Sequence, residues 1–173
     1  MSETVRAELG EALRVELPTV ADTRALGRAL AGLLLPGDLV ILAGPLGAGK
    51  TVLAQGIGAG LGVTGPVTSP TFVLARVHRG GRLPLVHVDA YRLGSVAEID
   101  DLDLDASLDD SVTIVEWGSG LVERLVDAHL VVHLDRNPES AGEAAADERT
   151  AELVPHGGSW PDRISRLAVT TRV

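Results

Sequence analysis

The most informative stretch of the chain reads Gly44-Pro45-Leu46-Gly47-Ala48-Gly49-Lys50-Thr51, which matches the pattern G-x-x-x-x-G-K-[ST] of a phosphate-binding loop. A continuous apolar run, Leu39 to Ala43, leads directly into it and predicts a buried parallel strand. The segment from Thr51 to Leu61 predicts a helix. Glycines in this context let successive backbone N–H groups turn around a phosphate, next to the positive end of the helix dipole. We therefore expect residues 44–51 to bind the phosphates of a nucleotide.

Two side chains of this loop carry specific expectations. Lys50 should reach the β- and γ-phosphates, and Thr51 should ligate Mg²⁺ through its hydroxyl. Lys50 is the only lysine among the 15 Lys and Arg residues, and it occupies the position where a compact ammonium fits better than a planar guanidinium. A single lysine at this position also leaves none for an Asn-Lys-x-Asp guanine-reading element, which favours ATP over GTP.

A phosphate loop of this kind needs an acid at the end of a neighbouring strand to hold Mg²⁺ or its water shell. Two apolar runs end in such an acid, the first at Asp89 and the second at Glu116. Aromatic residues follow both, namely Tyr91 and Trp117. These rings either anchor the strand ends by packing or line the nucleotide site, and the sequence leaves both interpretations open.

The rest of the chain alternates between strand-like and helical patterns. A helix should begin after the capping box formed by Thr19 and Asp22. Further expected elements are an opening strand from 12 to 17, a hairpin from 72 to 78 and 83 to 89, and late strands from 130 to 134 and 151 to 154. This order predicts an α/β sandwich with a mixed sheet, in a single domain covering residues 1–173. Residues 137–149 are rich in Ala, Glu, Pro and Gly and predict a mobile loop.

The composition limits the class of protein. Hydrophobic residues make up 45% and charged residues 23%, which is typical of a globular protein. The formal net charge of -9 removes the electrostatic attraction for nucleic-acid backbones, so any RNA should be held mainly by a partner. No apolar run is long enough for a membrane span, and the first twenty residues are too acidic for a signal peptide. We expect a cytoplasmic protein with no membrane partner.

Taken together, these motifs resemble the TsaE (YjeE) family, the ATPase component of bacterial threonylcarbamoyladenosine tRNA modification. The resemblance runs from about Thr19 to Val154. It rests on the phosphate loop and on three further segments in the same order, Thr68-Ser69-Pro70-Thr71-Phe72, His87-Val88-Asp89-Ala90-Tyr91-Arg92-Leu93 and Val115-Glu116-Trp117. It implies a P-loop NTPase-like three-layer sandwich with a mixed, mainly parallel sheet and late antiparallel strands. It also implies ATP and ADP as ligands, Mg²⁺ as cofactor, and TsaD and TsaB as partners.

The same resemblance implies roles for individual residues. Thr51 and Glu116 look like the Mg²⁺ ligands, Asp89 like a catalytic or switch carboxylate, and Lys50 like the catalytic lysine. The other implied positions are Ser69 and Thr71 in a switch segment, Tyr91 and Trp117 lining the site, and Thr23 and Arg149 on the base or ribose side. Pro45 and Gly118 depart from the family pattern, which usually has Asp and often has Pro at these positions.

Two other functions are compatible with a phosphate loop. A small-molecule kinase would transfer the γ-phosphoryl group to a metabolite, and it would need an arginine-rich lid. The only arginines clustered before the late region, Arg76, Arg79 and Arg82, lie around an expected hairpin turn, which is a poor lid. A nucleotide-binding scaffold that never hydrolyses ATP is the third alternative.

Overall fold

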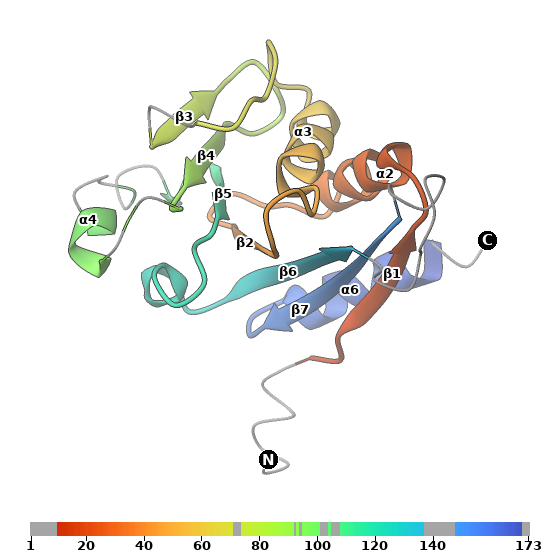
Figure 1. The fold of residues 1–173 in the computed structure, drawn as a ribbon. Helices are drawn as coiled ribbons and strands as arrows, with labels where there is room; N and C mark the ends of the chain where they lie inside the picture. Colours follow the sequence, from red (N-terminus) through yellow and green to blue (C-terminus); the bar gives the residue numbers. More distant parts are fainter. Residues whose placement is uncertain are drawn as a thin grey trace.

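The computed structural model describes residues 10–70, 74–91, 93, 95–100, 104, 108–136 and 148–170, and these contain one seven-stranded sheet flanked by helices (Figure 1). The strands are β1 (Leu13–Leu17), β2 (Leu39–Ala43), β3 (Ala75–His78), β4 (Leu85–Asp89), β5 (Val112–Glu116), β6 (His129–Arg136) and β7 (Arg149–His156). The helices are α2 (Val20–Ala31), α3 (Lys50–Leu61), α4 (Val96–Asp100) and α6 (Trp160–Thr170), with a 3-10 turn η1 (Glu123–Leu125). The strand order is β1-β7-β6-β2-β5-β4-β3.

The sheet is parallel in its centre and antiparallel at both sides. Strand β2 lies between β5 and β6 and is parallel to both, and β4 is parallel to β5. Strand β3 is antiparallel to β4, and β7 is antiparallel to both β6 and β1. The predicted mixed sheet with late antiparallel strands is confirmed. Because parallel strands end at the same edge, the carboxyl ends of β2, β4 and β5 lie together where the phosphate loop begins.

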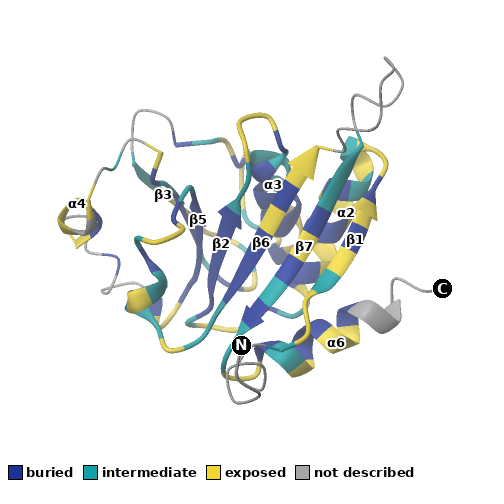
Figure 2. Ribbon diagram, turned by 60° about the horizontal axis from the view of Figure 1, so that its bottom comes forward, coloured by how far each residue is buried: buried dark blue, intermediate teal, exposed yellow. Residues whose placement is uncertain are grey.

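The central strands of the sheet are covered on both faces, which gives the predicted three layers there. Helices α2, α3 and α6 pack on one face, where Val40 and Leu42 of β2 point. Leu39 and Ile41 of the same strand belong to a second cluster, which includes Ile99 of α4 on the other face. Burial on both faces explains why the run leading into the loop is apolar throughout. Figure 2 shows buried residues concentrated in the central strands, whereas β1 alternates between buried and exposed residues.

Helices α2 and α3 are in close backbone contact through glycines. A Cβ atom on Gly27 would lie 2.6 Å from the Leu53 carbonyl oxygen, and one on Gly56 would lie 2.4 Å from the Arg24 carbonyl oxygen. No side chain larger than hydrogen fits at either position unless the helices separate. This contact explains why α3 forms despite its glycines, whose conformational cost opposes a helix. The capping box of Thr19 and Asp22 begins α2 as predicted.

Helix α6 is joined to the α2–β2 connection by a buried ion pair. The guanidinium of Arg163 contacts both carboxylate oxygens of Asp38, with a distance of 2.9 Å from Nη2 to Oδ1. It also donates to the Leu33 carbonyl at 2.9 Å and lies 3.7 Å from the ring centre of Trp160. The two charged side chains are only 7% and 10% exposed.

Strand β7 begins at Arg149, so the last residue of the segment expected to be a loop is already in the sheet. Residues 137–147 of that segment lie outside the described residues, as does Thr71.

Within the part of the chain that is described, no helix combines the length and hydrophobicity needed to cross a bilayer.

Two histidines face each other at the end of the sheet that is far from the phosphate loop. His129 and His156 are paired in register, and their rings stack with centroids 4.5 Å apart. Burial lowers the pKa of His129, and the proximity of His156 lowers it further, against the opposing effect of Glu123. Burial also lowers the pKa of His156, an effect opposed by Glu123 and reinforced by His133. Both rings therefore resist protonation in the folded protein.

We expect this pair to make stability depend on pH. A lowered pKa in the folded state means that the unfolded chain binds protons at higher pH, so the free energy of unfolding should fall as pH drops below the ordinary histidine value of 6.5. The free energy of unfolding should stop falling once the pH is below the pKa values that the two histidines have in the folded protein. Urea unfolding between pH 8 and 5 measures this slope. The double variant His129→Gln/His156→Gln should have a shallower slope than wild type, and an equal slope would contradict the assignment.

Candidate functional site

The phosphate loop folds as its glycines require. Gly44, Gly47 and Gly49 have φ values of 140°, 76° and 100°, all in the region that side chains disfavour. A Cβ on Gly44 would lie 2.1 Å from the carbonyl oxygen of Leu134 on β6, so only glycine can occupy the start of the loop. Gly49 caps α3 without a side-chain hydrogen bond. The first N–H groups of the helix are therefore not taken by a capping side chain, as phosphate binding requires.

Lys50 is folded into the loop. Its Nζ donates to the carbonyl oxygens of Gly44 and Pro45, both at 2.8 Å, and lies 4.0 Å from the ring centre of Trp117. The side chain is buried. Burial lowers the pKa of Lys50, whereas the nearby carboxylates of Glu116 and Asp89 oppose this effect. The ammonium is thus held at the mouth of the loop by groups that an anion can replace.

Glu116 lies next to the loop at the end of β5. Its Oε1 and Oε2 lie 3.2 and 3.4 Å from the hydroxyl of Thr51, which donates to the carboxylate. In octahedral Mg²⁺ coordination at about 2.1 Å, neighbouring ligand oxygens are about 3 Å apart. The hydroxyl and the carboxylate therefore already stand at nearly the separation of two adjacent ligands of one ion. Their oxygen chemistry and their spacing both fit Mg²⁺.

Asp89 is the register partner of Glu116 on the adjacent strand. The hydroxyl of Ser69 donates to its Oδ2 at 3.2 Å, and the backbone N–H of Tyr91 donates to Oδ1 at 3.0 Å. The ring of Tyr91 packs against that of Trp117, with centroids 5.0 Å apart. Ser69 thus connects the segment predicted as a switch to the second carboxylate of the site.

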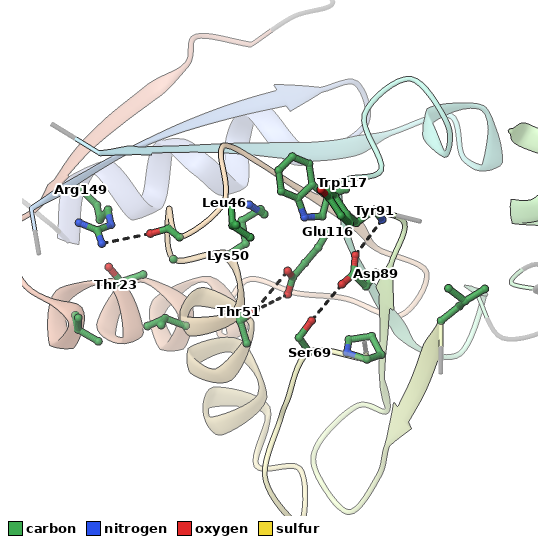
Figure 3. A pocket seen from close by; sticks show the side chains of 16 residues that line it. Thr23, Leu46, Lys50, Thr51, Ser69, Asp89, Tyr91, Glu116, Trp117 and Arg149 are labelled. Carbon is green, nitrogen blue, oxygen red and sulfur yellow. Dashed lines mark hydrogen bonds between the residues drawn. The ribbon is translucent and has the colours of Figure 1, made fainter. Parts of the chain in front are cut away.

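These residues surround one pocket of about 560 Å³ (Figure 3). Its lining includes most of the predicted positions, namely Thr23, Leu46, Gly47, Gly49, Lys50, Thr51, Ser69, Asp89, Tyr91, Glu116, Trp117 and Arg149. Figure 3 shows Thr23 and Arg149 on one side of Lys50, and Ser69, Asp89 and Tyr91 on the other. Three loop positions, Gly44, Pro45 and Ala48, are not among the lining residues. Arg149 also contacts the loop, where its Nη2 donates to the Gly47 carbonyl at 3.3 Å.

Trp117 has an unusual backbone conformation. Its φ of 63° is the only positive value of a non-glycine residue among those described. The next residue, Gly118, is closely surrounded, since a Cβ there would lie 2.5 Å from Cγ1 of Val115. Such strained positions concentrate at functional sites, where surrounding contacts hold them. Here the strain directs the indole ring towards Lys50 and Tyr91.

The sequence did not identify two contacts of the site. His87 is buried on β4 and lies 2.8 Å from Glu116. Arg136, at the end of β6, donates to the Gly47 carbonyl at 3.3 Å. His87 lies two residues before Asp89 on the same strand, so the two side chains point to the same face of the sheet. This spacing was a signal that His87 lies near the site. Arg136 had no comparable signal.

Comparison of the sequence and the fold with known proteins finds similarity to one family. The profile of the family described as threonylcarbamoyl adenosine biosynthesis protein TsaE matches residues 17–145. A Streptomyces coelicolor protein named tRNA threonylcarbamoyladenosine biosynthesis protein TsaE is 56% identical over 140 residues, which cover 79% of this chain and 93% of the relative. A Bacillus subtilis protein of the same name is 39% identical over 140 residues, or 80% and 83% of the two chains. The crystal structure of Bacillus subtilis YdiB superimposes with a TM-score of 0.74 at 28% identity, over 94% of this chain and 97% of that one.

Proposed function

The chain belongs to the TsaE family of tRNA threonylcarbamoyladenosine biosynthesis proteins, and from this membership we propose that it binds ATP with Mg²⁺ and hydrolyses it in support of that modification. The observation that supports the proposal best is the pairing of the Thr51 hydroxyl with the Glu116 carboxylate beside Lys50. A phosphate loop needs this combination of cation and oxygen ligands to bind a nucleotide with its metal.

Each residue then has a specific task. Backbone N–H groups of residues 46–51 bind the phosphates, and Lys50 exchanges the Gly44 and Pro45 carbonyls for phosphate oxygens. Thr51 and Glu116 hold Mg²⁺, which when bound neutralises charge on the β- and γ-phosphate oxygens. Asp89 orients the attacking water, because among the described residues its Oδ2 accepts only from the Ser69 hydroxyl, which water can replace. The base and ribose occupy the side of the pocket near Thr23 and Arg149.

The proposed partners are TsaD-like and TsaB-like proteins, which would carry the tRNA. The formal net charge of -9 supports this division, because the chain lacks the overall positive charge that RNA-binding proteins use. Many P-loop enzymes hydrolyse slowly until a partner supplies a group that stabilises the transition state. We propose that this chain works in the same way.

The test is to measure Mg²⁺-dependent ATP binding by calorimetry and phosphate release by the purified protein, alone and with the two partners. We expect binding that requires Mg²⁺, and slow release that the partners accelerate. Equal rates with and without partners would contradict the partner-dependent cycle. Binding without any hydrolysis would indicate a scaffold, and a phosphorylated acceptor formed in stoichiometric amount would indicate a kinase.

The contacts of Arg82 argue against the arginine-rich lid that a kinase would need. Its side chain donates to the Ala31 and Leu34 carbonyls at the end of α2, so it is not available to cover the phosphates.

A further inference from the structure

His87 is a buried polar side chain whose neighbours on its own strand and on β5 are apolar. It is 0% exposed and points to the face of the sheet covered by α3, together with its strand neighbour Leu85. Its register partner on β5 is Ile114, which is also fully buried. Burying an imidazole among apolar side chains costs free energy unless hydrogen bonds compensate for the lost water.

The contacts of the ring compensate only in part. Nε2 lies 2.8 Å from Oε1 of Glu116, while Nδ1 has no hydrogen-bond partner among the described residues. As a Mg²⁺ ligand Glu116 would be a carboxylate, which can only accept a hydrogen bond, so Nε2 would then carry the hydrogen and donate it. Within the described part of the chain, the only hydrogen bond of this buried ring is therefore to the carboxylate that also accepts from Thr51.

The position of the contact suggests what it does. Glu116 has two rotatable bonds between Cβ and its carboxylate, and the Thr51 hydroxyl alone, at 3.2 and 3.4 Å, does not select one of the two oxygens. The shorter bond from His87 selects Oε1, and together with the Thr51 contact it restrains the orientation of the carboxylate. Hydrogen bonds of this kind to metal-ligating carboxylates set the geometry that the ion meets.

We infer that His87 is the positioning residue of the Mg²⁺ site, holding Glu116 through an Nε2–H donor so that its carboxylate meets the ion in a fixed orientation. This inference rests on the proposed role of Glu116 as a Mg²⁺ ligand. His87 itself is fully buried and is not among the residues that line the pocket. Its loss should therefore weaken the response to Mg²⁺ and leave metal-free nucleotide binding unchanged.

The experiment compares wild type with three variants. His87→Leu removes the donor, and His87→Gln keeps an N–H at a similar distance from the backbone. Thr113→Val is the matched control, because Thr113 is equally buried and its hydroxyl has no partner among the described residues, but it points to the other face. Calorimetry with a non-hydrolysable ATP analogue, across MgCl₂ concentrations and in EDTA, gives the half-saturating Mg²⁺ concentration and the metal-free affinity.

We expect His87→Leu to raise the half-saturating Mg²⁺ concentration about 10–100-fold and to leave the metal-free affinity at the wild-type value. His87→Gln should restore the response to Mg²⁺, and Thr113→Val should not alter it. An unchanged Mg²⁺ response in His87→Leu would overturn the inference alone. Wild type that shows no Mg²⁺-dependent binding would overturn the proposed function and this inference together.

A second measurement applies if His87→Leu does not fold. The ¹⁵N spectrum of histidine-labelled wild type shows which ring nitrogen carries the hydrogen. A protonated Nε2 with a bare Nδ1 supports the inference. A protonated Nδ1 with a bare Nε2 overturns it, because the ring would then have nothing to donate to Glu116.

Discussion

Replacing Lys50 with alanine is expected to lower ATP hydrolysis about 10²–10³-fold, the range found when a single charge-stabilising donor is removed from an active site. Lys50 supplies the one side-chain amine of the chain, and its Nζ lies at the mouth of the loop between the Gly44 and Pro45 carbonyls. No other side-chain ammonium exists to replace it. Phosphate release at saturating MgATP, measured with partners present, gives the effect.

Lys50→Arg is the informative companion variant. The space for Nζ is limited by two carbonyl oxygens at 2.8 Å and by the Trp117 ring, whose centre lies 4.0 Å away. A planar guanidinium needs more room and a different arrangement of acceptors, so arginine should not restore the rate. The thermal unfolding midpoint of each variant shows that the protein has folded. A Lys50→Ala protein that keeps more than about a tenth of wild-type activity would contradict the role given to the lysine.

Breaking the ion pair between Arg163 and Asp38 should have the largest effect on stability. Both side chains are almost completely buried, and removing one leaves the other charge without a partner, which typically costs about 3–5 kcal/mol. We expect Arg163→Ala to lower the free energy of unfolding by this amount in urea titrations. Asp38→Ala should do the same, and it also removes the acceptor of the Leu35 N–H.

A double-mutant cycle separates the interaction energy between Asp38 and Arg163 from the contacts that each side chain makes with other residues. If the two charges stabilise each other, the double variant Asp38→Ala/Arg163→Ala should be far less destabilised than the sum of the single changes. Additive losses would show that the pair itself contributes little. Arg14→Ala provides the control, since the ion pair of Arg14 with Glu16 is exposed and its removal should leave stability nearly unchanged.

Local patterns predicted the strand, loop and helix of the phosphate site, because the geometry there follows from residues close in the sequence. They also predicted both carboxylates of the site. A strand that ends in an acid places it at the carboxyl edge of a parallel sheet, and the register pairing of Asp89 with Glu116 brings the two together. The β3–β4 hairpin and the late strands followed from the same kind of pattern.

Contacts between distant segments could not be read in this way. Arg163 and Asp38 are 125 residues apart, and no periodicity indicates that they pair. The contact of His87 with Glu116 depends on which two strands are neighbours in the sheet. Helix α6 was missed although the sequence contained a signal. Trp160, Ile164 and Leu167 are spaced by four and three residues, as on one face of a helix, and all three are buried.

The glycine contact between α2 and α3 has a mechanical consequence for the pocket. Thr23 is carried by α2 and Lys50 by α3, and the two helices are in backbone contact at Gly27 and Gly56, where no side chain separates them. We therefore expect the part of the pocket wall at Thr23 and the part at Lys50 to move together. We expect the pocket to adjust to the size of its occupant mainly at the opposite wall, where Ser69 is joined to Asp89 by one side-chain hydrogen bond and the exposed ring of Tyr91 rests against that of Trp117.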